Sequence, residues 1–227
     1  HDEIPASVVD DDLFRNPPTF LIGTIDKFAR MVWDARSRVF LGRGREDVLP
    51  PSLIIQDELH LISGPLGSVA GMYEILITAL AEKKVNNKKM IIISNSSKRK
   101  QTSINRLPIL GFNSDLFDEV ITSGEMIWQT ISLSLEDYGD NLKKCFHIFD
   151  NTKEDGIKYR DGLNNLEFVS DIREANFILA CTPYKNSLPM DYLPILNEAY
   201  KNKMLMFCAN PDFETVEKVD KKNIFCM

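Results

Sequence analysis

An acidic pair stands at the end of an apolar segment in the first third of the chain. The stretch SLIIQDELHLISGPLGS (52–68) places Asp57 and Glu58 directly after the short apolar run 53–56. In open α/β sheets, ligands bind at the carboxyl ends of strands. In a nucleotide-hydrolysing motor, one carboxylate there holds Mg²⁺ on the phosphates, while the other polarises the attacking water. The pair therefore predicts ATP and Mg²⁺ chemistry, with a solvated acidic turn as the alternative.

A second polar cluster follows the next apolar run. MIIISNSSKRK (90–100) ends its strand pattern at Ser94, and Asn95, Ser96 and basic residues come next. A serine hydroxyl at a strand end can donate a hydrogen bond to a phosphoryl oxygen. The backbone N–H groups that follow it can bind an anion at the start of a helix. The alternative is an ordinary helix cap formed by Ser96 or Ser97.

The neighbourhood of the acidic pair carries a family resemblance. IIQDELHLISGPLGS, together with NPPTFLIGTIDKFARMVWDAR upstream, resembles superfamily 2 helicases, and most closely the helicase-like ATPase of the DISARM anti-phage system. The resemblance covers about residues 3–80. It implies that the acidic pair serves ATP hydrolysis and that Thr24, Asp26 and Lys27 contact nucleic acid. A motor of this kind also needs a phosphate-cradling GxxxxGK[ST] loop, which the sequence does not contain.

The neighbourhood of Ser94 carries a different resemblance. ISNSSKRK, LGFNSDLFDEVITSGEMIW, EANFILACTPY and LMFCANPD resemble, in this order, haloacid dehalogenase-like hydrolases of subclass IIA, which include small-molecule phosphatases. The resemblance runs from about residue 80 to the end of the sequence. It implies that Ser94 is the second motif and binds phosphate with Asn95 and Ser96. It also places Asn210 and Asp212 at the return from a cap to the core.

Other motifs of that hydrolase family have no counterpart. Asp57 stands about where the aspartate nucleophile would be, but Leu59 occupies the place of the second carboxylate. The sequence ends soon after Asp212, before a lysine motif and an acidic metal-binding pair would come. We therefore expect a helicase-like fragment joined to a hydrolase-like fragment near residues 78–88.

Strand and helix signals alternate along the chain. Continuous apolar runs predict strands at 19–25, 53–56, 90–93, 118–122, 144–150, 176–181 and 204–209. Helical patterns cover 26–40, 69–84, 98–111, 124–139 and 192–202, and a glycine-bearing loop is expected at 153–163. This alternation is typical of a parallel sheet covered by helices.

The expected fold class is α/β, with a Rossmann-like parallel-sheet core fragment and a second, cap-like α/β subdomain. We assign residues 1–82 to the helicase-like part and 83–227 to the hydrolase-like part, with the cap at 118–209. The acidic, proline-bearing segment 1–18 and the segment 213–227 are expected to be the most mobile.

Composition limits the function classes. The net charge of −6 and the pI near 5.2 argue against a dedicated nucleic-acid coat, although a local basic face is compatible with them. The sequence has no apolar run long enough to cross a bilayer and no signal-peptide pattern, which predicts a cytoplasmic protein. No metal-binding spacing joins the cysteines, so reduced core thiols are expected at Cys145, Cys181 and Cys208, with Cys226 near the end.

Several other residues have a structural and a functional interpretation. His147 alternates with apolar neighbours and is read as a half-buried strand residue rather than a catalytic base. Trp33 and Trp128 fall on apolar helical stripes and are expected in the core. The basic run 98–100 is read as a solvated helix start, with phosphate binding as the alternative. The run 10–12 of three aspartates is read as a disordered acidic stretch rather than a metal site.

The expected function is a fusion of the two fragments without a complete catalytic site. One alternative is an Mg²⁺-dependent phosphatase for a small phosphorylated metabolite, with Asp57 as nucleophile and metal ligand. Another is a module that binds nucleic acid or a nucleoside triphosphate without hydrolysis, through residues 19–45 and in particular Lys27, Arg30 and the GRGR loop. Phosphate contacts of that last kind weaken with salt.

Overall fold

The computed structural model describes most of the chain as two compact units. It describes residues 6–31, 33–57, 71–73, 75–76, 89–134, 142–150, 152, 154–210, 215–219 and 222–226. Unit one comprises His1–Ile92 and Leu107–Glu119, and unit two comprises Ile93–Arg106 and Val120–Met227. The predicted boundary between residues 82 and 83 lies outside the described residues, as does most of the helix expected at 69–84. The described residues of that segment, 71–73 and 75–76, are helical.

Unit one begins with three short helices: α1 (Asp10–Arg15), α2 (Ile25–Arg30) and the 3-10 helix η1 (Ala35–Leu41). The acidic run 10–12 therefore forms the first turn of a helix, where carboxylates are favoured by the helix dipole. The single helix expected at 26–40 is interrupted. The carboxylate of Asp34 accepts the backbone N–H of Arg36 and starts a new helix there.

The strand expected at 19–25 was a wrong prediction. Residues 19–24 form no strand, and Phe20 and Ile22 are 74% and 81% exposed. An apolar run becomes a buried strand only if a neighbouring strand accepts its backbone hydrogen bonds, and here the segment leads instead into α2. The expectation that Trp33 lies in the core was also wrong, because its side chain is 75% exposed. Its indole N–H points to the sulfur of Met72.

A three-stranded sheet has the order β1-β2-β3, formed by β1 (Leu53–Asp57), β2 (Lys89–Ser94) and β3 (Glu119–Thr122). The backbone N–H of Lys89 donates to Ser52 O over 2.9 Å, and that of Asp118 donates to Met90 O over 2.8 Å. The beginning of each strand is thus hydrogen-bonded to the beginning of its neighbour, as in a parallel sheet. The strands expected at 53–56, 90–93 and 118–122 are confirmed, but the last of them joins this sheet rather than the remaining cap strands.

Unit two contains a four-stranded parallel sheet of order β5-β4-β6-β7. Its strands are β4 (Lys144–Ile148), β5 (Glu167–Val169), β6 (Phe177–Ala180) and β7 (Leu205–Cys208). The expected strands at 144–150, 176–181 and 204–209 are confirmed, whereas β5 was not predicted because only three residues form it. The α/β class with parallel sheets is therefore confirmed.

Helices and turns connect these strands. They are α4 (Lys100–Ile104), η3 (Pro108–Leu110), η4 (Ser114–Leu116), α5 (Ser123–Ser134), α6 (Glu154–Lys158), η6 (Ile172–Glu174), η7 (Pro189–Tyr192) and α7 (Leu193–Lys201). Helix α6 lies where a loop was expected. Gly156 suggested a turn, but its role is spatial, because a Cβ there would overlap the ring of Phe149.

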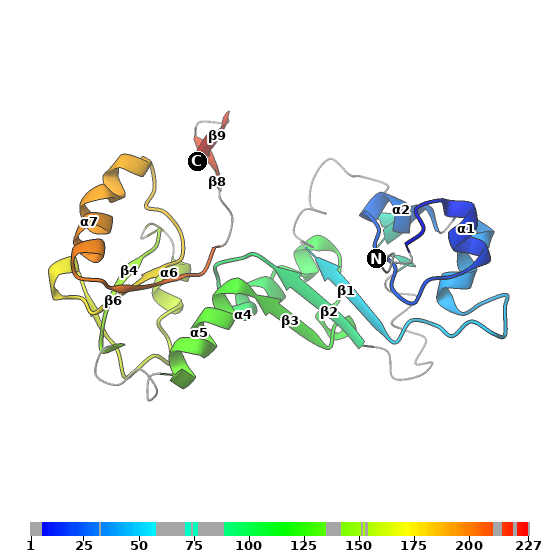
Figure 1. The fold of residues 1–227 in the computed structure, drawn as a ribbon, viewed down its shortest axis with the longest axis horizontal. Helices are drawn as coiled ribbons and strands as arrows, with labels where there is room; N and C mark the ends of the chain where they lie inside the picture. The colour runs from blue at the N-terminus through cyan, green and yellow to red at the C-terminus, as the bar shows by residue number, and fades with distance from the viewer. Residues whose placement is uncertain are drawn as a thin grey trace, which may run out of the picture. The chain divides into compact units, whose positions relative to one another are not determined.

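Both faces of the four-stranded sheet are covered. One face packs Cys145, Phe177 and Leu179 against α5 and the segment after α6, and all three are fully buried. The other face packs Ile178 against Ala199 of α7, which runs beside the sheet in orange in Figure 1. Alternate residues of each strand therefore serve opposite cores, as expected for a parallel sheet buried on both sides.

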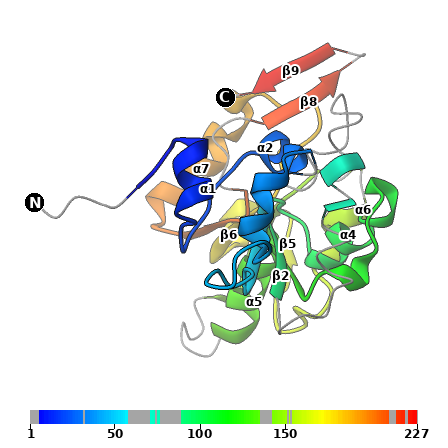
Figure 2. The same ribbon diagram turned by 90° about the vertical axis from the view of Figure 1, so that its right-hand side faces the viewer.

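The chain closes with an antiparallel hairpin of β8 (Thr215–Val219) and β9 (Lys222–Cys226), shown as two opposed arrows in Figure 2. The sequence had suggested only a mobile tail at 213–227. Valine and threonine in the first strand, and isoleucine and phenylalanine in the second, are residues with high strand propensity. The short distance between the two runs permits the hairpin.

The core of unit two holds a buried histidine. His147 is 5% exposed, its Nε2 lies 3.3 Å from Cys181 Sγ, and its Nδ1 accepts a hydrogen bond from Arg160 Nε over 3.2 Å. The Arg160 guanidinium lies over the rings of Phe149 and Phe168 at 4.9 and 4.5 Å. Burial, aided by the positive charge of Arg160, lowers the pKa of His147 to about 3. The histidine is therefore a neutral structural residue, more deeply buried than the sequence suggested.

The cysteines differ in their environments. Burial raises the pKa of Cys145 and of Cys181 to about 12, so both are unreactive core thiols, as expected. Cys208 is exposed, which corrects its assignment to the core. It lies on β7, the edge strand of the sheet. The side chain of Cys226 lies outside what the structure describes.

We expect unit two to lose stability as the pH falls from 6.5 toward 3. The unfolded chain binds a proton on His147 near pH 6.5, whereas the folded core resists protonation down to about pH 3. The free energy of unfolding should therefore fall by about 1.4 kcal/mol for each pH unit in this window. Trp128 in a Trp33→Phe background can report urea unfolding of unit two at each pH. His147→Gln should flatten the dependence, and an unchanged slope in that variant would contradict the assignment.

Candidate functional site

The loop that follows β2 begins with a buried hydroxyl. Ser94 ends the strand and is 7% exposed, and its Oγ accepts the backbone N–H of Ser96 over 3.2 Å. The next N–H groups also turn inward, since Lys98 N donates to Ser96 Oγ over 3.4 Å. The backbone N–H groups of Ser96 and Lys98 are thus used in shaping the loop itself, whereas the Ser94 hydroxyl accepts one of these bonds and keeps its own proton to donate.

This loop is fastened to the corner between β3 and α5. Gly124 N donates to Ser96 O over 3.0 Å, and Thr122 Oγ1 donates to Lys98 O over 2.7 Å. Gly124 permits the close approach, because a Cβ at this position would overlap the backbone carbonyl of Ser97. The two sequence blocks ISNSSKRK and TSGE therefore form one hydrogen-bonded corner.

A buried ion pair completes the corner. Arg99 Nε donates to Glu125 Oε2 over 2.8 Å, and the same oxygen accepts Lys100 N, the first N–H of α4, over 3.0 Å. The side chain of Glu125 is 8% exposed. Burial opposes ionisation of this carboxyl, but the hydrogen bonds from Arg99 and Lys100 outweigh it and lower the pKa.

The cations of this loop are engaged within the protein. The guanidinium of Arg99 lies 3.7 Å from the ring centroid of Trp128, and both side chains donate to the carbonyl of Asp161. Lys98 Nζ lies 2.5 Å from the carboxylate of Asp155 at the start of α6. Trp128 also packs against the core of unit two, as expected from its place on an apolar stripe.

The predicted site residues lie in several parts of the chain. Asp57 ends β1 and belongs to unit one, and Ser94 ends the neighbouring strand β2 and belongs to unit two. Asn95 and Ser96 follow Ser94 directly. Asn210 follows β7 of the four-stranded sheet, and its backbone carbonyl accepts a hydrogen bond from the Cys208 thiol. Glu58 and Asp212 lie outside the described residues.

The predicted magnesium site depends on Asp57. The carboxylate of Asp57 is on an exposed residue. Within the described part of the chain, no three histidine, cysteine, aspartate or glutamate side chains gather closely enough to hold a metal ion. Mg²⁺ is usually held by one or two carboxylates together with substrate phosphates. A cation at Asp57 would therefore need Glu58 or a phosphate as a further ligand.

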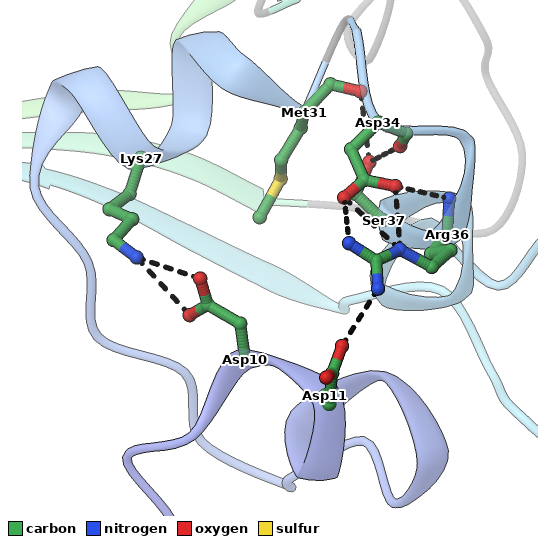
Figure 3. A network of polar contacts seen from close by, with 7 residues as sticks. All are labelled: Asp10, Asp11, Lys27, Met31, Asp34, Arg36 and Ser37. Atoms are coloured by element: carbon green, nitrogen blue, oxygen red, sulfur yellow. Dashed lines mark hydrogen bonds and ion pairs between the residues drawn. The ribbon is translucent and has the colours of Figure 1, made fainter.

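The residues expected to contact nucleic acid surround the start of α2. Thr24 Oγ1 donates to Asp26 Oδ1 over 2.5 Å, a bond between two side chains that lowers the pKa of Asp26. Lys27 Nζ forms an exposed ion pair of 2.9 Å with Asp10 of α1 (Figure 3). Arg36 is likewise held by Asp34 and Asp11. A nucleic-acid phosphate would therefore share Lys27 with the carboxylate of Asp10.

The sequence did not identify Glu125, whose carboxylate accepts hydrogen bonds from both Arg99 and Lys100 in the corner. In the sequence, Glu125 stands within the block LGFNSDLFDEVITSGEMIW, and Arg99 stands within the basic run 98–100. The two residues are 26 positions apart, so no local pattern connects them. A usable signal was a single acidic residue on the first turn of an otherwise uncharged helix, at 123–134.

No protein-family model matches the chain. Over 107 residues the chain is 38% identical to DISARM protein DrmA from Bacillus paralicheniformis, in an alignment that takes in 34% of this chain and 10% of DrmA. The chain thus spans about a tenth of the length of that relative. Among the described residues, no helix is both long and apolar enough to cross a membrane.

A solved structure shares the fold. It is a haloacid dehalogenase-like hydrolase from Brucella suis 1330, which aligns with a TM-score of 0.57 over 77% of this chain and 59% of its own, at 21% identity. At this identity the likeness concerns the fold alone. Both resemblances seen in the sequence are therefore confirmed: the chain combines a segment similar to DrmA with a haloacid dehalogenase-like fold.

Proposed function

We propose that the chain is a fusion of a helicase-like segment and a haloacid dehalogenase-like segment that keeps the hydrolase fold without a complete catalytic site. The observation that carries this proposal is that the polar groups after β2 form contacts with other groups of the protein itself. Ser94, Lys98 and Arg99 are each engaged by groups of the protein itself. The Ser94 hydroxyl keeps its own proton to donate, but Lys98 and Arg99 could bind a phosphoryl group only in competition with Asp155 and Glu125.

The energetics support a structural role for this corner. A buried carboxylate that loses its cation leaves an uncompensated charge in a poorly solvated place, which is costly. Phosphate binding by Arg99 would require that loss at Glu125, which also caps α4. The corner is therefore better suited to joining β2, β3 and α5 than to binding a substrate.

A Mg²⁺-dependent phosphatase is the second candidate. The observation that favours it is the sheet order, in which β1 and β2 are neighbours and end in Asp57 and Ser94. In this reading Asp57 attacks the phosphorus of a small phosphorylated metabolite, and Ser94 donates to a phosphoryl oxygen. Leu59 could not protonate the leaving group, which weakens the candidate. For the helicase-like segment, we propose ATP and nucleic acid as further candidate partners.

We expect no turnover of an aryl phosphate above the level of an Asp57→Asn variant in the presence of Mg²⁺. The same result is expected for ATP, with or without single-stranded DNA. Release of inorganic phosphate measures both reactions, and Asp115→Asn serves as an exposed aspartate control. Turnover that persists in Asp115→Asn and disappears in both Asp57→Asn and Ser94→Ala would establish the phosphatase instead.

We also expect Glu125→Ala to destabilise unit two by about 2 kcal/mol, because it leaves the charge of Arg99 partly buried and removes the cap of α4. Glu154→Ala is the matched control, since Glu154 forms an exposed pair with Lys158 and its loss should change stability little. Urea unfolding followed through Trp128, again with Trp33→Phe, measures both. Equal stabilities of the two variants would show that the corner does not hold the fold together.

A further inference from the structure

Unit one contains an arginine-rich pocket that the proposed function does not use. The pocket has a volume of about 610 Å³ and lies between α1, η1 and the loop after η1. Its lining includes five arginines: Arg15, Arg36, Arg38, Arg43 and Arg45. Volumes of this order are typical of sites for small molecules.

The charge of the pocket is opposite to that of the chain. The chain carries a net charge of −6, yet five of its ten arginines line this one pocket. Only one acidic residue, Asp11, shares the lining, and it forms a 2.7 Å ion pair with Arg36. Among the described residues, the guanidinium groups of Arg38 and Arg43 have no side-chain partner. Arginine is the residue best suited to binding phosphate, because its planar group offers two parallel donors.

The backbone brings these arginines together. Arg36 and Arg38 come from η1, and Arg43 and Arg45 come from the glycine-bearing loop that follows it. Gly42 and Gly44 adopt φ values of 65° and 82°, in the left-handed region that favours glycine. The loop can therefore turn twice within four residues and direct alternate arginines to the same pocket.

Two of the arginines are held in place by carboxylates. Asp34 accepts Arg36 Nη2 over 2.7 Å, as Figure 3 shows. Asp47 accepts Arg45 Nε over 3.0 Å, while Arg45 Nη1 donates to the carbonyl of Arg15 over 2.5 Å. These pairs fix the two guanidinium groups but also occupy them, so among the described residues Arg38 and Arg43 are the arginines best placed to contact an anion.

The pocket also has an apolar part. Phe14 and Val39 contribute to its lining, and the guanidinium of Arg36 lies 4.7 Å from the ring centroid of Phe14. A ligand with several phosphate charges and a flat or apolar portion would meet complementary groups on both sides.

We propose that this pocket binds a compact polyphosphate, such as a nucleoside polyphosphate or inorganic tripolyphosphate. A small ligand is favoured over an extended nucleic-acid strand because acidic residues adjoin the pocket lining in the sequence. Asp10 and Asp12 lie on α1 beside Asp11, and Glu46 and Asp47 follow Arg45. A compact polyanion needs fewer cations close together than a long strand, which would require a basic surface that the acidic chain does not favour. This site is separate from the corner after β2, so its existence does not depend on the proposed function.

Isothermal titration of the full chain with inorganic tripolyphosphate tests the proposal, with ATP as a second titrant. The double variant Arg38→Gln/Arg43→Gln should weaken binding by roughly tenfold or more, since hydrogen bonds from charged donors are strong. Its fold should be retained, because neither side chain has a described partner to lose. Arg106→Gln is the matched control, an exposed arginine outside the pocket, and should change the affinity less than about twofold. Gly44→Ala should also weaken binding without removing a charge, because it strains the loop.

Three results would overturn the proposal. The first is the absence of tripolyphosphate and ATP binding by a folded chain. The second is equal weakening by Arg106→Gln and the double variant, which would indicate non-specific attraction to surface charge. The third is tight binding of a single-stranded DNA oligonucleotide that tripolyphosphate does not displace, which would make this face a nucleic-acid surface.

Discussion

The buried pair of Arg99 and Glu125 connects the main elements of unit two. The pair lies where the loop after β2 meets the first turn of α5, and Glu125 also caps α4. Arg99 in turn lies over Trp128, which packs against the core beside the four-stranded sheet. One carboxylate thus fixes a loop, a helix start and an aromatic side chain at once. The contacts of Gly124 and Thr122 join the same two segments beside the pair.

Unit one is stabilised differently. Its helices are short, and exposed ion pairs join α1 to α2 and η1 (Figure 3). Such pairs contribute little stability individually and weaken as salt rises. They do set the orientation of arginine side chains with high specificity. The acidic composition of the chain therefore serves, in this unit, to hold the positive charges in place.

Much of the fold could be predicted from the sequence because buried parallel strands are continuous apolar runs. The runs at 90–93, 144–150 and 176–181 proved to be strands for this reason, and the run at 53–56 also forms a strand, although Leu53 and Ile55 are exposed. The run at 19–25 failed because an apolar segment does not reveal whether a neighbouring strand exists to pair with it. The same limit explains why the strand at 118–122 was assigned to the wrong sheet.

The candidate site was harder to predict, since ion pairs between distant residues leave no local pattern. The sequence identified Ser94 and the basic run after it, but not Glu125 or Asp155, which engage that run. It likewise identified the GRGR loop but not Arg15 or Arg38. Glycine was read as a turn signal at Gly156, where its actual role is to admit the ring of Phe149.

The order of the four-stranded sheet has a consequence for how the chain acquires its structure. The central strand β4 precedes both of its neighbours in the sequence, and its residue Lys144 pairs with Glu167 while Cys145 pairs with Phe177. During synthesis β4 therefore emerges with neither partner available. Its apolar side chains must stay unpaired until the segments that hold β5 and β6 have left the ribosome. Parallel pairing across such separations is slow and exposes apolar surface. The period between the appearance of β4 and that of β6 is thus the time when a nascent chain of this kind is most prone to aggregate.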